Sequence, residues 1–153
     1  MKNNKDNQIL QIQRRIEALL LKRDYIIIAI DGNSGAGKST LAKKLSQIYD
    51  CNVFHMDHFF LTPELKTRER LNEVGGNVDY ERFYEEVAKG IKSGQDFNYR
   101  IYNCRKCDFD RTITVKPKRI SIVEGVYSMH PTLIDLYDFK IFVSVNKEEQ
   151  SRR

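Results

Sequence analysis

The stretch IIIAIDGNSGAGKST, residues 26–40, constrains this chain more than any other part of it. A run of branched apolar residues stops at Asp31, three glycines fall between positions 32 and 37, and a lysine and two hydroxyl residues follow. This order predicts a buried strand, a tight loop and the start of a helix. Glycines let successive backbone N–H groups face one anion, and the helix N-terminus adds positive charge. The stretch therefore predicts a phosphate-binding turn.

Residues 32–39, GNSGAGKS, fit the pattern G-x-x-x-x-G-K-[ST], the P-loop. We expect Lys38 to neutralise the β- and γ-phosphates, the Ser39 hydroxyl to ligate Mg²⁺ and Thr40 to reach the α-phosphate. The candidate nucleotide-binding residues are Gly32, Asn33, Ser34, Gly35, Ala36, Gly37, Lys38, Ser39 and Thr40. The motif predicts a bound nucleoside triphosphate with Mg²⁺, but it does not name the group that accepts the phosphoryl.

Short apolar runs alternate with helical patterns along the rest of the chain. The runs that predict strands lie at 25–30, 52–56, 119–124 and 139–145. The patterns that predict helices lie at 5–22, 38–49, 80–94 and 131–137. Asp79 is a candidate N-cap and Gly94 a candidate stop for the third helix, and Pro131 suits the first turn of the fourth. Strands that alternate with helices predict an α/β fold, an open parallel sheet flanked by helices.

Residues 97–116 have a different pattern, because they alternate and turn around CRKCD, as a β-hairpin does. We expect this hairpin to project from the sheet as an insertion. The whole chain, 1–153, is predicted to be one domain of the P-loop NTPase type. Cys104 and Cys107 lack a second ligand pair for zinc, so two free thiols in the hairpin turn are the favoured interpretation.

Composition narrows the classes of partner. The net charge is +5, with basic residues spread along the chain, which suits an anionic small molecule and does not indicate nucleic acid. No apolar run approaches the roughly 20 residues of a membrane span. The polar N-terminus lacks a secretory signal and the cysteine count is odd, so a cytoplasmic protein with reduced thiols is expected. A homo-oligomer is compatible with these features.

Two carboxylates end predicted strands. Glu124 follows the strand 119–124 and suits support of the magnesium ion, although a surface glutamate would give the same pattern. Asp57 follows the strand 52–56, so it should lie in the crevice at the carboxyl ends of the strands. There it could accept a proton from an attacking hydroxyl, or it could cap the next helix. From the residues alone, both roles of Asp57 remain open.

A switch GTPase is the rival that these motifs raise. Asn146 and Lys147 follow a predicted strand, where N-K-x-D would read guanine, but Glu149 replaces the aspartate. The third strand is followed by VEGV, without the D-x-x-G of that class. These departures disfavour a GTPase.

Taken together, the motifs resemble the uridine kinase family of P-loop kinases, related to phosphoribulokinase and pantothenate kinase. The resemblance runs from about Tyr25 to the C-terminus and lies in GNSGAGKST, HMDHFF, NVDYERF, YRIYNC and VEGVYS. It implies ATP and Mg²⁺ as cofactors and a kinase that phosphorylates the 5′-hydroxyl of a nucleoside. It also implies that Asp57 is the base, Asp79 holds the ribose hydroxyls, Tyr102 contacts the nucleoside and Glu124 supports the metal.

Two departures from the family pattern keep alternatives open. Cys107 occupies the place of the histidine that pyrimidine-specific members carry, so a different nucleoside, pantothenate or a sugar phosphate remains an alternative acceptor. The ending NKEEQSRR predicts a helix start with Asn146 as N-cap, followed by only the first residues of an arginine-rich lid. A chain truncated before the lid is expected to bind triphosphate but to phosphorylate slowly. A P-loop protein that binds nucleotide without catalysis is the alternative from another class.

Overall fold

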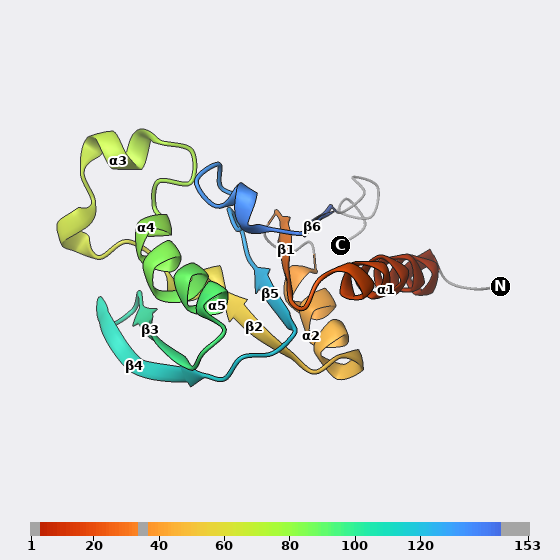
Figure 1. The fold of residues 1–153 in the computed structure, drawn as a ribbon. Coiled ribbons are helices and arrows are strands. Elements are labelled where there is room, and N and C mark those ends of the chain that lie inside the picture. The colour runs from red at the N-terminus through yellow and green to blue at the C-terminus, as the bar shows by residue number, and fades with distance from the viewer. Residues whose placement is uncertain (1–3, 34–36, 145–153) are drawn as a thin grey trace.

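The computed structural model describes residues 4–33 and 37–144, and the side chains from residue 7 onward within them. The helices are α1 (Asn4–Lys22), α2 (Lys38–Ile48), α3 (Arg68–Asn72), α4 (Tyr80–Phe83) and α5 (Lys89–Ser93). The strands are β1 (Ile26–Gly32), β2 (Cys51–His55), β3 (Phe97–Asn103), β4 (Asp108–Val115), β5 (Ile120–Glu124) and β6 (Phe139–Val143). Figure 1 shows α1 and α2 on one side of the central strands, and α4, α5 and the β3–β4 hairpin on the other.

The central sheet is parallel, with strand order β2-β5-β1-β6. Its strands end in register, because His55 pairs with Glu124 and Ile30 also pairs with Glu124. The ends of β2, β5 and β1 therefore meet at one edge, which is the edge that carries ligands in open α/β sheets. The predicted fold class, an open parallel sheet flanked by helices with a hairpin insertion, is confirmed.

Both faces of β1 are buried, which explains why its sequence is a continuous apolar run. One face carries Ile26, Ile28 and Ile30, which pack in a core with residues of α1 and α2. The other carries Ile27 and Ala29, which pack in a second core with residues of α4 and the hairpin. Alternate side chains of one strand thus supply two separate cores.

The β3–β4 hairpin is an antiparallel two-stranded sheet of its own, as the sequence predicts. Its pairing shifts register between Ile101 and Tyr102, a bulge that bends the strand near its tip. At the tip, the Cys107 amide donates to the Cys104 carbonyl at 3.3 Å, and both thiols are free and exposed.

The helix over 80–94 is present in three consecutive parts. It begins as α4, continues through a π-helical turn at Tyr84–Ala88, and ends as α5. Both predicted ends are confirmed, because the Asp79 side chain accepts from the Arg82 amide and Gly94 adopts φ +67° after the last turn. The π-helical turn was not predicted.

The predicted helix over 131–137 is wrong. The segment contains only a 3₁₀ turn at Ile134–Leu136, and the Leu136 amide donates to Leu133 three residues back. The next residues must enter the sheet at once, because the Asp138 amide already donates to the Ile27 carbonyl. That tertiary contact leaves no room for further helical turns. The predicted helix start beyond Asn146 lies outside the described residues.

Candidate functional site

The site lies where β1, β2 and β5 end. Gly32 ends β1, and Gly37 precedes α2 with φ +93°, a conformation that glycine adopts without strain. Lys38, Ser39 and Thr40 form the first turn of α2. The predicted ligands Ser34, Gly35 and Ala36 lie outside the described residues.

Lys38 is buried at the start of α2, with 8% of its surface exposed. Its Nζ donates to the backbone carbonyl of Asn33 at 2.9 Å. The ammonium therefore lies next to Asn33, the residue that follows the last residue of β1. A buried ammonium at the first turn of a helix suits an anionic ligand.

Glu124 and Ser39 converge from two different elements. Both carboxylate oxygens of Glu124 lie 3.4 Å from the Ser39 hydroxyl, although the two residues are 85 positions apart. The Glu124 side chain is only 4% exposed, and its oxygens are the hard ligands that Mg²⁺ prefers. This pair of oxygen donors fits a magnesium ion that completes its coordination with water and phosphate oxygens.

Asp57 lies in a 3₁₀ turn, Met56–His58, directly after β2. The next helical segments, at Pro63–Leu65 and Arg68–Asn72, have Thr62 and Thr67 at their N-cap positions, so Asp57 is not the N-cap residue of either. Its side chain is exposed at the edge where β2 and β5 end. The turn also ends β2 at His55, one residue earlier than predicted.

Gly125 brings the Asp57 segment close to β5. It adopts φ +139°, and a Cβ on it would lie 2.7 Å from the Cβ of Met56. The missing side chain lets the chain after β5 contact the residue that precedes Asp57. The glycine of the E-G pair at 124–125 thus has a packing function.

His55 is a site residue that the sequence analysis missed. Its Nδ1 lies 2.6 Å from Glu124 Oε1, and this hydrogen bond raises the pKa of His55 above its ordinary value. The His58 ring stacks edge-on at 5.4 Å between centroids, and burial lowers the pKa of His58. The 3₁₀ turn after β2 thus brings the two histidine rings together.

Asp31 also escaped the sequence analysis, although it directly precedes the P-loop. Its carboxylate accepts from the amides of Gly32, Tyr127 and Met129, at 2.6, 3.2 and 2.9 Å. These bonds fasten the segment after β5 to the end of β1. The signal for this role was the position of an acidic residue at a strand end.

The two predicted acceptor residues come from different elements, the start of α4 and the strand β3. Asp79 is 5% exposed, caps α4 and lines a cavity of about 480 Å³ with Arg70, Glu73 and Glu81. Tyr102 is 4% exposed, and its ring stacks edge-on against Phe109 at 5.4 Å. Burial raises the pKa of Tyr102, which keeps its hydroxyl protonated.

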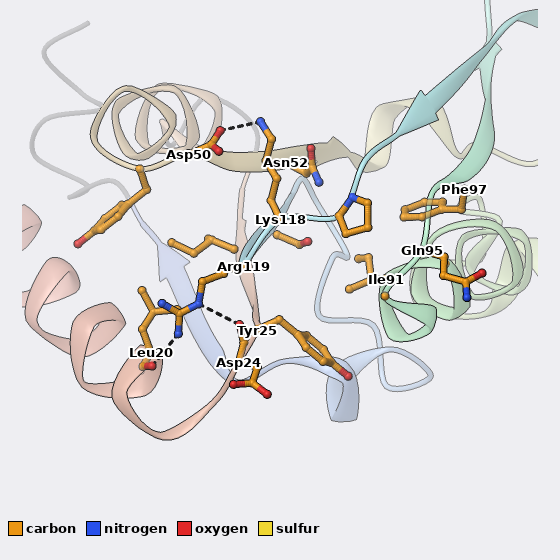
Figure 2. Close-up of a pocket in the computed structure, with 16 residues that line it drawn as sticks. Leu20, Asp24, Tyr25, Asp50, Asn52, Ile91, Gln95, Phe97, Lys118 and Arg119 are labelled. Carbon is orange, nitrogen blue, oxygen red and sulfur yellow. Dashed lines mark hydrogen bonds and ion pairs between the residues drawn. The ribbon is translucent and has the colours of Figure 1, made fainter.

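A larger cavity, of about 560 Å³, lies at the opposite edge of the sheet, where the strands begin. Figure 2 shows Asn52, Phe97, Lys118 and Arg119 around it. Lys118 pairs with Asp50 at 2.7 Å, and Arg119 donates to backbone carbonyls that include Leu20 and Asp24. Both cations are therefore already bonded within the protein.

The described residues hold neither a metal-ligand cluster nor a membrane-spanning helix. Among residues 4–33 and 37–144, no cluster of three or more His, Cys, Asp or Glu is placed to hold a metal ion. Every helix in the same part of the chain is too short or too polar to cross a membrane.

The fold and the site together define a P-loop protein whose β5 acid meets the first turn of the helix after the loop. A profile described as the Phosphoribulokinase / Uridine kinase family matches residues 27–151. The chain therefore belongs to the phosphoribulokinase/uridine kinase family, and the resemblance seen in its motifs is confirmed.

Individual relatives agree with this assignment. A phosphoribulokinase of Synechocystis is 25% identical over 131 residues, 80% of this chain and 39% of its own length. A uridine kinase of Chlamydia pneumoniae is 29% identical over 145 residues, 84% of this chain and 61% of its own length. This chain thus spans less than two thirds of the length of either relative.

A solved structure shares the fold. It is described as a possible uridine kinase from Bacillus stearothermophilus, with a TM-score of 0.68 and 20% sequence identity. The match covers 92% of this chain and 85% of that one. At this identity the likeness shows the fold alone.

Proposed function

We propose that the protein transfers the γ-phosphoryl group of ATP, with Mg²⁺, to the primary hydroxyl of a small acceptor, a nucleoside. The observation that carries the proposal is the meeting of Glu124 and Ser39 at 3.4 Å, at the same edge as Asp57. One pair supplies oxygens for a metal, and the neighbouring carboxylate is free to orient a hydroxyl. Membership of a family of kinases supports the same reaction.

Each residue has a defined task in this reaction. Lys38 would neutralise phosphate charge, and Ser39 and Glu124 would hold a magnesium ion, which supplies positive charge near the transferring group when it is bound. Asp57 accepts the proton of the acceptor hydroxyl and holds that oxygen in line with the phosphorus. Catalysis then consists of positioning and charge neutralisation, without a covalent intermediate on the protein.

Asp79 and Tyr102 are the proposed acceptor ligands. The buried Asp79 carboxylate already accepts from the Arg82 amide at 3.1 Å, and its second oxygen lies 3.9 Å from the Arg82 Nε. We propose that this second oxygen accepts from a sugar hydroxyl. The Tyr102 ring, which packs edge-on against Phe109, is the proposed contact for a flat base.

The residue at position 107 favours a second candidate within the same reaction class. Cys107 is exposed, and its thiol lies 3.4 Å from the carbonyl of Cys104 in its own turn. A thiol is a weak hydrogen-bond donor and cannot replace an imidazole in reading a pyrimidine. Another small alcohol, such as pantothenate or a sugar phosphate, is therefore the alternative acceptor.

Acceptor-dependent release of ADP tests the proposal. The panel contains purine and pyrimidine nucleosides, pantothenate and a pentulose phosphate, each with ATP and Mg²⁺. Stimulation by a nucleoside supports the proposal, and stimulation by pantothenate or the sugar phosphate alone supports the second candidate. Tight ATP binding without stimulation by any acceptor would instead indicate a non-catalytic nucleotide-binding protein.

A further inference from the structure

Arg82 is a buried cation that the reaction described above does not use. Its side chain is 8% exposed, and its guanidinium lies between two rings, 4.2 Å from the centroid of Phe59 and 5.1 Å from that of Phe109. Guanidinium groups stack on aromatic faces because they are planar and weakly hydrated. The stack joins the segment after β2, which holds Phe59, to β4, which holds Phe109.

The hydrogen bonds of Arg82 reach the same two parts of the molecule. One terminal nitrogen donates to the His58 carbonyl at 2.7 Å, next to Asp57 in the chain. The other donates to the Arg100 carbonyl at 2.8 Å, in the strand that carries Tyr102. A single side chain therefore connects the segment of the proposed base to the strand of the proposed acceptor contact.

A third connection leads to Asp79. Arg82 Nε lies 3.9 Å from the Asp79 carboxylate, and it has no hydrogen-bond partner among the described residues. A buried N–H without a hydrogen-bond partner costs free energy. The position of this N–H near the Asp79 carboxylate therefore calls for an explanation. At this place it fixes the charge environment of the carboxylate that caps α4.

Glu86 completes the arrangement from the π-helical turn. It accepts from Arg82 at 3.2 Å, and its carboxylate also receives the Arg100 guanidinium at 2.7 Å. The Arg100 guanidinium in turn stacks on the Phe109 ring, 4.1 Å from its centroid. The Glu86 carboxylate thus balances the buried positive charge of Arg82, while the Arg82 Nε near Asp79 keeps no hydrogen-bond partner among the described residues.

We infer that Arg82 is a positioning residue, which holds the Asp57 segment, the Asp79 carboxylate and the Tyr102 strand in one geometry for the acceptor. The inference rests on the proposed function for its meaning in catalysis, but the mechanical link itself can be tested without activity. A displacement of about 1 Å at a reacting group can lower the rate about 10²-fold.

The test uses Arg82→Lys, which keeps the charge but cannot stack as a plane or donate to two carbonyls and a carboxylate together. We expect kcat/KM for the acceptor to fall about 10²-fold, with the KM for ATP within about twofold of wild type. Arg82→Ala should lose as much, and guanidinium added to the solution should restore part of the rate. A variant that is merely less stable would not show this rescue.

Arg119→Lys is the matched control, because Arg119 also donates to backbone carbonyls but at the opposite edge of the sheet. It should lower the unfolding temperature without changing the acceptor kinetics. Unchanged acceptor kcat/KM in Arg82→Lys, or an equal loss in both variants, would overturn the inference.

Hydrogen exchange separates this inference from the proposed function. In Arg82→Lys, the amides of β3, β4 and the segment 58–61 should exchange faster together, while those of β1 and β5 keep the wild-type rate. This result would stand even if no acceptor in the panel stimulated turnover, in which case only the proposed function would fail. Exchange that is unchanged, or faster throughout the sheet, would contradict a positioning role.

Discussion

The carboxylate of Glu124 lies 3.4 Å from the hydroxyl of Ser39, and this contact joins the end of β5 to the first turn of α2. The two residues bring a hard carboxylate and a hydroxyl to one point beside the buried Lys38. The geometry suits a magnesium ion, and it leads to the first prediction.

Removing either oxygen donor should weaken the use of magnesium. Glu124→Gln is expected to raise the Mg²⁺ concentration for half-maximal turnover at least about tenfold, and Ser39→Ala to raise it as well. The two substitutions should be less than additive, because they act on one ion. A titration of turnover against Mg²⁺ provides the check, and an unchanged Mg²⁺ dependence in both variants would refute the assignment.

Asp57→Asn should abolish most of the chemistry and leave binding intact. We expect turnover to fall about 10²–10⁴-fold, the usual contribution of a general base, while the affinity for ATP changes little. The thermal midpoint should also stay close to wild type, because Asp57 is exposed and the next helical segments have Thr62 and Thr67 as their N-cap residues. A large loss of stability with normal turnover would show that Asp57 is structural.

Asp79 has a structural role that can be separated from its proposed chemical one. Asparagine caps helices about as well as aspartate, so Asp79→Asn should cost less than about 1 kcal/mol, whereas Asp79→Ala should cost about 1 kcal/mol or more. Both variants should raise the KM for the acceptor. If Asp79→Asn leaves acceptor KM unchanged while Asp79→Ala raises it, capping alone accounts for the residue.

Gly125→Ala should displace the segment that carries Asp57. The added Cβ would lie 2.7 Å from the Cβ of Met56, and the φ of +139° is itself unfavourable for alanine. We expect a loss of more than about 2 kcal/mol in the free energy of unfolding, together with lower turnover. Gly94→Ala is the control, since its φ is +67° but no atom lies within 4 Å, and about 1 kcal/mol without a kinetic effect is expected.

Glu86 should make the protein sensitive to acid. Burial alone would raise the pKa of Glu86, but hydrogen bonds from Arg100 and the charge of Arg82 outweigh it and hold the pKa below its ordinary value. A carboxyl with a lowered pKa stabilises the fold above its unfolded value of about 4.3, and this stability is lost as the pH falls through the folded pKa. Glu86→Gln should therefore flatten the acid limb of a stability curve measured by denaturant titration. An acid limb as steep as that of wild type would show that Glu86 does not contribute.

The sheet could be predicted from the sequence because its signals are local. β1 and β5 are continuous apolar runs, and their predicted bounds of 25–30 and 119–124 differ from the observed ones by one or two residues. The glycines of the P-loop motif predicted the connection from β1 to α2, and the alternating residues around Cys104 predicted the hairpin. Each of these features needs only neighbours along the chain.

The failures came from contacts between distant residues. The bond from the Asp138 amide to Ile27 ends the segment 131–137 before a helix can form, and no local pattern announces it. His55 and Arg82 were missed for the same reason, because their partners Glu124 and Arg100 lie on other elements. Asp57, Asp79, Tyr102 and Glu124 were found through motifs, and their chemical roles stay predictions.

The hairpin forms a two-stranded sheet that shares no strand with the central one. Tyr102, the proposed acceptor contact of the hairpin, therefore lies on a hydrogen-bonded framework separate from that of the central sheet. A chimera that receives the hairpin of a relative would leave every backbone bond of the central sheet intact. Under the proposed function, such an exchange should change the acceptor preference while the central sheet stays as it is.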